Sequence, residues 1–169
     1  MSDLPFYIRT MRGDDVSALQ EFAKGHENNP EYFLTSLDEQ LQDKRVVLIA
    51  FQDGAIAGYA HLNFFPLYQP FRSMGIPEIQ DLYVHPDFRR NGIGEQLVTA
   101  CESRAWVEEV SHIGIGVGVA GNFGAAQRLY ARMGYIPDGA GVVFDRQSVS
   151  VGEVRAVDDR LCLMLLKTL

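Results

Sequence analysis

Cysteine, tryptophan and long apolar runs are scarce in this sequence, which has 2 cysteines and 1 tryptophan in 169 residues. Cys101 and Cys162 lie far apart without a CxxC motif, so neither a disulfide framework nor a zinc site is predicted. No window approaches the roughly 18 apolar residues of a membrane-spanning helix, and residues 1–5 lack the pattern of an export signal. We therefore expect a cytoplasmic protein with reduced cysteines and no membrane partner.

Positive charge is also in short supply, with 15 Lys and Arg against 22 Asp and Glu and a net charge of -7. This balance repels polyanions and argues against nucleic acid as a partner, whereas a cationic partner is electrostatically easier. Arg89 and Arg90 are a local exception, because they stand together beside a glycine-rich turn. One anionic group could dock there.

The chain has the length and composition of one globular domain over residues 1–169, with 47% hydrophobic residues. Hydrophobic periodicity predicts strands and helices in the order β-α-α-β-β-β-α-β-α-β-β. The expected strands cover 6–11, 46–51, 56–64, 78–84, 112–119 and 161–167, and the expected helices cover 16 to about 24, where Gly25 ends the helix, about 31–41, 92–107 and 122–133. Prolines predict a loop over 65–77, and broken valine runs predict an irregular hairpin within 139–160.

Three local details follow from residue types. Asp14 or Asp15 is the expected N-cap of the first helix, and Asp53 with Gly54 is the expected turn of a hairpin. In the second helix, the apolar side chains that we expect on one face are Phe33, Leu34, Leu37 and Leu41.

The segment 81–95 places a strand, a turn with two glycines and a helix start in series. The first N–H groups of a helix have no partner inside the helix, and the helix dipole puts partial positive charge there. Glycines at Gly92 and Gly94 let the backbone come close to a ligand, and Arg89 and Arg90 add full charges. The segment therefore predicts a phosphate site.

Two motifs in this sequence resemble those of one family. The pattern Arg89-x-x-Gly92-x-Gly94 resembles the [Gln/Arg]-x-x-Gly-x-[Gly/Ala] pyrophosphate loop of the GNAT superfamily of acyl-CoA-dependent N-acetyltransferases. The segment from Asn122 to Tyr135 resembles the Asn, Ala, Tyr and Gly-Tyr segment that follows the fifth strand in the same family. The resemblance covers about residues 7–137 and the last strand, and it leaves 139–160 poorly matched.

The resemblance implies a GNAT-like α/β (α+β) fold, a mixed and mostly antiparallel sheet of about seven strands with helices on both faces, splayed between strands 4 and 5. It also implies acetyl-CoA as the cosubstrate, with a pyrophosphate site at the turn and a pantetheine site on the preceding strand. Asn122 would contact the coenzyme near the pantetheine, and Ala125 would leave room for it. The residues implied on the strand and the turn are Leu82, Tyr83, Val84, Arg89, Arg90, Asn91, Gly92, Ile93, Gly94 and Glu95.

The implied reaction is direct transfer of an acetyl group to a primary amine, without a metal. Tyr130 would be the general acid that protonates the leaving thiolate, since a phenol with an ordinary pKa of about 10 is protonated at neutral pH. Glu78 is the first candidate for the base that deprotonates the amine. Asp81, His85 or a chain of waters are the alternatives that the sequence leaves open.

Two functions other than acetyl transfer also have some support in the sequence. Gly116 to Gly121 spell G-x-G-x-x-G, and Asp138 lies about 20 residues on, as in a dinucleotide-binding oxidoreductase. The chain that follows is too short for the rest of that fold, so we interpret Gly114, Gly116 and Gly118 as small residues that permit close packing on one strand. A non-catalytic acyl-CoA-binding sensor remains an alternative. The acceptor is expected to be a small-molecule or peptide amine, and the apolar last strand could serve in a homodimer.

Overall fold

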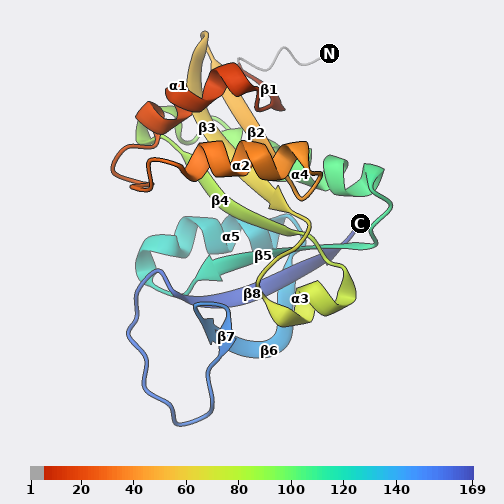
Figure 1. Ribbon diagram of the computed structural model, residues 1–169. Helices are drawn as coiled ribbons and strands as arrows, with labels where there is room; N and C mark the ends of the chain where they lie inside the picture. The colour runs from red at the N-terminus through yellow and green to blue at the C-terminus, as the bar shows by residue number, and fades with distance from the viewer. Residues whose placement is uncertain (1–5) are drawn as a thin grey trace. The chain divides into compact units, whose positions relative to one another are not determined.

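The computed structural model describes residues 6–169, which divide into two compact units. The first unit comprises the chain through Asn63 together with residues 80–104. The second unit comprises residues 64–79 and 105–169. Residues 1–5, for which the sequence predicts no export signal, lie outside the described residues. Figure 1 labels the helices and strands.

The first unit is built on the antiparallel strands β1 (Phe6–Thr10), β2 (Arg45–Gln52) and β3 (Ala55–Asn63), with β2 in the middle. The predicted turn joins β2 and β3, where Asp53 and Gly54 have φ of 51° and 81° as a two-residue hairpin requires. Helices α1 (Val16–Phe22) and α2 (Tyr32–Leu41) lie in front of these strands in Figure 1. Their shared core contains Leu19, Phe33, Val47, Ile49 and Tyr59.

Two details of these helices differ from expectation. Asp15 occupies the N-cap position of α1 but does not cap that helix, because its carboxylate accepts from the Arg9 guanidinium and from the Arg12 N–H of the preceding 3-10 turn, at 2.7 Å each. In α2, Phe33 is buried and Leu37 is half-buried, but Leu34 and Leu41 are exposed. The helix instead turns Ser36 and Gln40 inward, and the Gln40 amide bridges the Met11 carbonyl and the Val47 N–H at 2.9 Å each.

The second unit contains β5 (His112–Gly118), β6 (Ile136–Phe144), β7 (Gln147–Ser148) and β8 (Leu161–Thr168). Strand β8 pairs antiparallel with both β5 and β6. Asp145 and Arg146, with φ of 49° and 64°, form the turn of the β6–β7 hairpin, which is the irregular hairpin expected within 139–160. Helix α5 (Gly124–Arg132) follows β5 after a 3-10 turn over Gly121–Phe123.

The prediction of a plain loop over 65–77 was wrong, because it contains helix α3 (Gln69–Met74). Pro70 lies in the first turn of α3, where its missing N–H costs no intrahelical bond, and Gly75 ends the helix in the left-handed conformation with φ of 66°. Phe71 and Tyr68 then pack with Val143, Cys162 and Met164 in the core of the second unit.

The strand order of the sheet is β1-β2-β3-β4-β5-β8-β6-β7, where β4 is Glu78–Val84 and is followed by helix α4 (Ile93–Val107). Strands β4 and β5 form the parallel pair, and their ladder joins only Glu78 with Gly114 and Ile79 with Ile115. The mixed, mostly antiparallel fold is therefore confirmed, whereas the splay between strands 4 and 5 stays a prediction. The sheet has eight strands rather than about seven, because the two-residue β7 adds one.

No helix within residues 6–169 is both long and apolar enough to cross a bilayer. The two cysteines are free and buried, as predicted. Burial raises the pKa of the Cys101 thiol, which keeps it protonated and unreactive.

Candidate functional site

The predicted phosphate site lies in the first unit, between β4 and α4. A 3-10 turn over Pro86–Phe88 leads into this segment, where Arg90 and Gly92 have φ of 65° and 80°. Left-handed residues in a short turn direct successive N–H groups toward one side, which is the geometry of an anion-binding nest. The Gln96 N–H donates to the Gly92 carbonyl at 3.0 Å, so the N–H groups of Ile93 and Gly94 precede the first intrahelical bond of α4.

The charges at this turn are accessible. Arg89, Arg90 and Asn91 are exposed, and the Arg89 Nε donates to the Val84 carbonyl at 2.9 Å. That bond fixes the arginine over the end of β4, and it also occupies the carbonyl of Val84. Any pantetheine pairing at Val84 in this conformation would therefore use its N–H or a second lone pair of that oxygen.

The strand that precedes the turn comes close to β3. A Cβ at Gly58 would lie 2.6 Å from the Tyr83 carbonyl oxygen, so glycine is required there. Leu82, Tyr83 and Val84 are half-buried, and the Tyr83 ring stacks on His26 with the centroids 4.1 Å apart. The structure therefore brings Leu82 to Glu95 together in the first unit.

The other predicted coenzyme residues belong to the second unit. Asn122 lies in the 3-10 turn before α5, Ala125 lies in the first turn of α5, and both are exposed. Tyr130 is buried near the end of α5, with 5% exposure, and its ring lies 6.2 Å from that of Tyr135. The Gln127 amide donates to the Gly118 carbonyl at 2.8 Å, which fixes α5 against the end of β5.

The first candidate for the base, Glu78, begins strand β4. Its side chain is fully buried, and one of its oxygens lies 2.6 Å from Nη2 of Arg146. Arg146 comes from the turn of the β6–β7 hairpin, and its Nε is a buried donor without a partner among residues 6–169. Sequence reasoning missed Arg146, because nothing in an Asp-Arg turn indicates which distant carboxylate it will meet.

The two alternative bases have different surroundings. Asp81 is an exposed residue of β4 with φ of 51°, and it accepts a hydrogen bond from the Tyr32 hydroxyl. His85 is half-buried, and its Nδ1 accepts from the Asp87 N–H at 3.3 Å and lies 3.6 Å from the Asp87 carboxylate. Tyr32 was not foreseen, since it reaches Asp81 from a helix 49 positions away.

A buried histidine, His61, lies close to Tyr32, the residue that donates to Asp81. The His61 ring is 5.2 Å from that of Tyr32, and its Nδ1 lies 3.0 Å from the Arg45 guanidinium. Burial lowers the pKa of His61 to about 3, with Arg45 acting in the same direction and Asp81 opposing it. The ring is therefore neutral at neutral pH, and its Nε2 has no partner within the described part of the chain.

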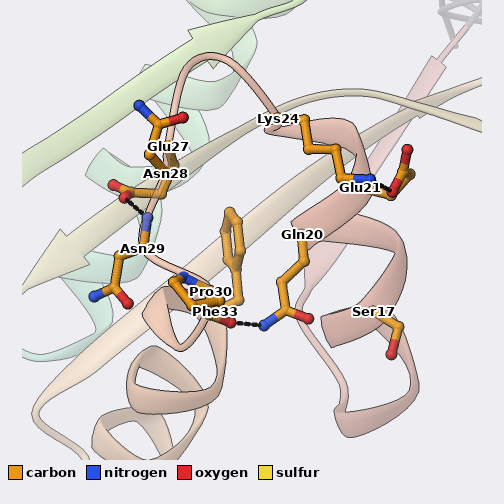
Figure 2. Close-up of a pocket in the computed structure, with 9 residues that line it drawn as sticks. All are labelled: Ser17, Gln20, Glu21, Lys24, Glu27, Asn28, Asn29, Pro30 and Phe33. Atoms are coloured by element: carbon orange, nitrogen blue, oxygen red, sulfur yellow. Dashed lines mark hydrogen bonds and ion pairs between the residues drawn. The ribbon is translucent and has the colours of Figure 1, made fainter.

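A cavity of about 390 Å³ opens between the end of α1 and the start of α2. Figure 2 shows the Phe33 ring standing between the helix and the loop, with Gln20 on one side and Glu27 on the other. Lys24 in its wall is paired with Glu21. The cavity therefore has polar side chains in its walls and the aromatic ring of Phe33 as its floor.

The glycine pattern of β5 serves packing. A Cβ at Gly114 would lie 2.2 Å from the Phe71 ring, and a Cβ at Gly118 would lie 2.3 Å from the Phe123 ring. Gly116 and Gly118 are inside the strand, whereas a dinucleotide fingerprint needs them in the turn after it. Within residues 6–169, no group of His, Cys, Asp and Glu side chains could hold a metal ion.

Known proteins resemble this chain in sequence. The model of the acetyltransferase (GNAT) family matches residues 14–135. Mycothiol acetyltransferase of Mycolicibacterium vanbaalenii is 42% identical over 62 residues, a match that spans 37% of this chain and only 18% of that protein.

Solved structures share the fold over nearly the whole chain. A ribosomal-protein-alanine N-acetyltransferase from Brucella melitensis superimposes with a TM-score of 0.72 at 21% identity, covering 96% of this chain and 99% of that one. The protein yncA of Salmonella typhimurium, solved with its cofactor acetyl-CoA, gives a TM-score of 0.70 at 19% identity, covering 97% and 94%. Since the family model spans more than half of the sequence, the chain belongs to the GNAT family of acetyltransferases.

Proposed function

We propose that this protein is an N-acetyltransferase that moves an acetyl group from acetyl-CoA to a primary amine by direct sequential transfer. The turn from Arg89 to Gly94 carries the proposal, because exposed arginines there precede a helix start whose first N–H groups have no partner inside the helix. Such a site suits the pyrophosphate of coenzyme A. Both cysteines are buried, which favours direct transfer over an acyl-enzyme intermediate.

In this proposal the coenzyme is held mainly by backbone groups. The N–H groups from Arg90 to Glu95 bind the pyrophosphate, with Arg89 adding charge, and main-chain groups of Leu82, Tyr83 and Val84 bind the pantetheine. Asn122 contacts the pantetheine arm of the coenzyme, and Ala125 leaves space for that arm. The exposure of Asn122 and Ala125 supports these roles.

The chemical step needs one acid and one base. The amine nitrogen attacks the thioester carbonyl carbon, the C–S bond breaks, and the leaving thiolate takes a proton from the Tyr130 hydroxyl. The burial of Tyr130 supports this role, because a phenol held out of bulk water keeps a fixed orientation.

Glu78 remains our first proposal for the base that takes the proton of the amine, with Asp81, His85 or a water chain as alternatives. Glu78 is fully buried and lies 2.6 Å from Arg146, so proton uptake from the amine would require that this contact loosens.

Release of free thiol from acetyl-CoA, measured with a panel of primary amines, tests the function. We expect thiol release that depends on the amine. Binding of acetyl-CoA without thiol release for any amine would instead identify the non-catalytic acyl-CoA sensor. Stabilisation by NAD but not by acetyl-CoA in a thermal-shift assay would contradict both.

The names of the relatives support a small-molecule or peptide amine as the acceptor, because they include an enzyme for mycothiol and one for ribosomal-protein alanine. One acetyltransferase domain over residues 1–169, a cytoplasmic location, the absence of nucleic acid and membrane partners, and a homodimer remain predictions.

A further inference from the structure

The first unit contains a second group of polar side chains, which we call the Asp81 cluster. It consists of Asp81 and Glu27 with the rings of Tyr32, Tyr59, Tyr83 and His26. The Tyr32 hydroxyl donates to Oδ2 of Asp81, which leaves Oδ1 for another donor. Burial first, and then the charges of Asp81 and Glu27, raise the pKa of Tyr59, so both carboxylates lie within electrostatic reach of the same phenol.

These two carboxylates have no ion-pair partner among residues 6–169, although Glu27 accepts a hydrogen bond from the Asn29 N–H at 2.7 Å. Lys24 lines the same cavity as Glu27 and pairs with Glu21, and Arg45, whose charge acts on Tyr32 as that of Asp81 does, pairs with Glu39. The cluster therefore attracts a cation and offers no free cation to bind a carboxylate. Asp81 is exposed, so a ligand can reach it from solvent.

The aromatic rings around these charges also favour a cation. His26 stacks on Tyr83 at 4.1 Å, and Tyr83 lies 5.8 Å from Tyr59. The electron-rich faces of such rings attract alkylammonium groups. Tyr83 and Tyr32 are only half-buried, which leaves parts of both rings accessible.

Two further observations indicate a ligand. His61 is fully buried against Tyr32 and Tyr59 and senses the charge of Asp81, yet its Nε2 has no partner among the described residues. The cavity of about 390 Å³ shares Glu27 with the cluster, and its floor, Phe33, contacts the Tyr59 ring at 5.2 Å. A cavity of this size accommodates a short alkyl chain.

We infer that the Asp81 cluster binds a cationic group of the acceptor, and that the acceptor is a diamine or polyamine rather than an amine that carries a carboxylate. The inference rests on the proposed function, since it names the substrate class of the same reaction. Asp81 fixes the ammonium group that does not react, Glu27 attracts the positive charge of the second amine before that amine loses its proton, and the rings shield the chain between them from water.

Three probes of equal chain length test this inference: 1,4-diaminobutane, 1-butylamine and 4-aminobutanoate. Calorimetric titration, with and without saturating coenzyme A, should show that the diamine binds about tenfold more tightly than the monoamine, the factor expected for one charged hydrogen bond. The amino acid should bind most weakly. Equal affinity for the three probes under both conditions would overturn the inference.

Variants connect the preference to the cluster. Asp81→Asn should abolish the preference for the diamine and should fold, because asparagine tolerates the left-handed conformation at this position. Glu27→Gln and Tyr32→Phe should each reduce the preference for the diamine over the monoamine a few-fold. Asp38→Asn, which removes an exposed carboxylate from the same unit, is the matched control and should retain it. Full preference in Asp81→Asn would contradict the assignment.

The outcome separates the inference from the proposed function. A charge preference that depends on Asp81, found without thiol release for any amine, would support the cation site and contradict the acetyltransferase. Thiol release with no preference among the probes would support the acetyltransferase and contradict the cation site.

Discussion

Glu78 and Arg146 are 68 positions apart in the sequence, and their side chains form an ion pair of 2.6 Å in the second unit. Glu78 is fully buried, and the ion pair offsets part of the cost of removing its carboxylate from water. The contact ties the start of β4 to the turn of the β6–β7 hairpin. A residue expected only to do chemistry therefore also holds the C-terminal part of its unit together.

Arg146→Met should lower the free energy of unfolding by about 3 kcal/mol, because it removes the ion pair of a buried carboxylate. Urea denaturation measures this loss. Combining it with Glu78→Gln should restore part of the stability. Arg155→Met, which removes an arginine from a more exposed ion pair with Glu153, should have a much smaller effect. Equal losses of unfolding free energy in Arg146→Met and Arg155→Met would show that the buried ion pair stabilises the protein no more than the exposed one.

Tyr130→Phe should reduce kcat about 100-fold or more while the KM for acetyl-CoA changes little, because only proton donation to the thiolate is lost. Steady-state measurement of thiol release gives both constants. Tyr135→Phe is the control, since its ring is a buried neighbour of Tyr130 and should leave kcat almost unchanged. Normal turnover in Tyr130→Phe would remove this hydroxyl from the mechanism.

The pH profile of kcat/KM distinguishes the candidate bases. If Glu78 takes the proton, Glu78→Gln should flatten the acidic limb and lower the rate by about 100-fold. Asp81→Asn should instead raise the KM for the amine and keep the limb, because Asp81 binds a cation in our proposal. Circular dichroism checks that both variants are folded. If the acidic limb of the kcat/KM profile is unchanged in Glu78→Gln, a residue other than Glu78 is the base.

Gly114→Ala should destabilise the protein by about 1–3 kcal/mol, since the new methyl group would overlap the Phe71 ring. Thermal or urea unfolding measures the effect, and adding Phe71→Leu should relieve part of it. Gly121→Ala is a matched control, because no heavy atom lies within 4 Å of a Cβ at that position. Similar stability of the two alanine variants would contradict the close packing of α3 on β5.

His61 should make stability fall in acid. Its pKa is lowered from the ordinary 6.5 to about 3 in the folded protein, mainly by burial. Between those two values the unfolded chain binds a proton that the folded chain does not, so stability should decrease by up to about 1.4 kcal/mol per pH unit as the pH falls. Above pH 6.5 the effect vanishes.

Urea midpoints measured between pH 7 and pH 4 test this slope. Substituting His61→Gln should remove much of the slope, whereas His112→Gln, which removes a less buried histidine, should keep it. An identical pH dependence in the native protein and in His61→Gln would show that another group causes the loss.

Much of the secondary structure was readable from the sequence because its signals are local. The continuous apolar run of β2, the Asp53-Gly54 turn and the boundaries of β4 follow from neighbouring residues alone. The helix α3 was missed because proline and glycine indicate a loop and a capped short helix equally well. Only packing of Phe71 on β5 and β8 distinguishes the two.

The sequence by itself determined the membership in the GNAT family and the turn at Arg89 to Gly94, where we predict a phosphate site, since both depend on residues close together in the chain. Tertiary structure decided which side chains meet. It paired Glu78 with Arg146 and Tyr32 with Asp81, and it buried His61. These contacts join residues from distant segments, and their energies depend on burial and distance, which no local pattern of residue types specifies.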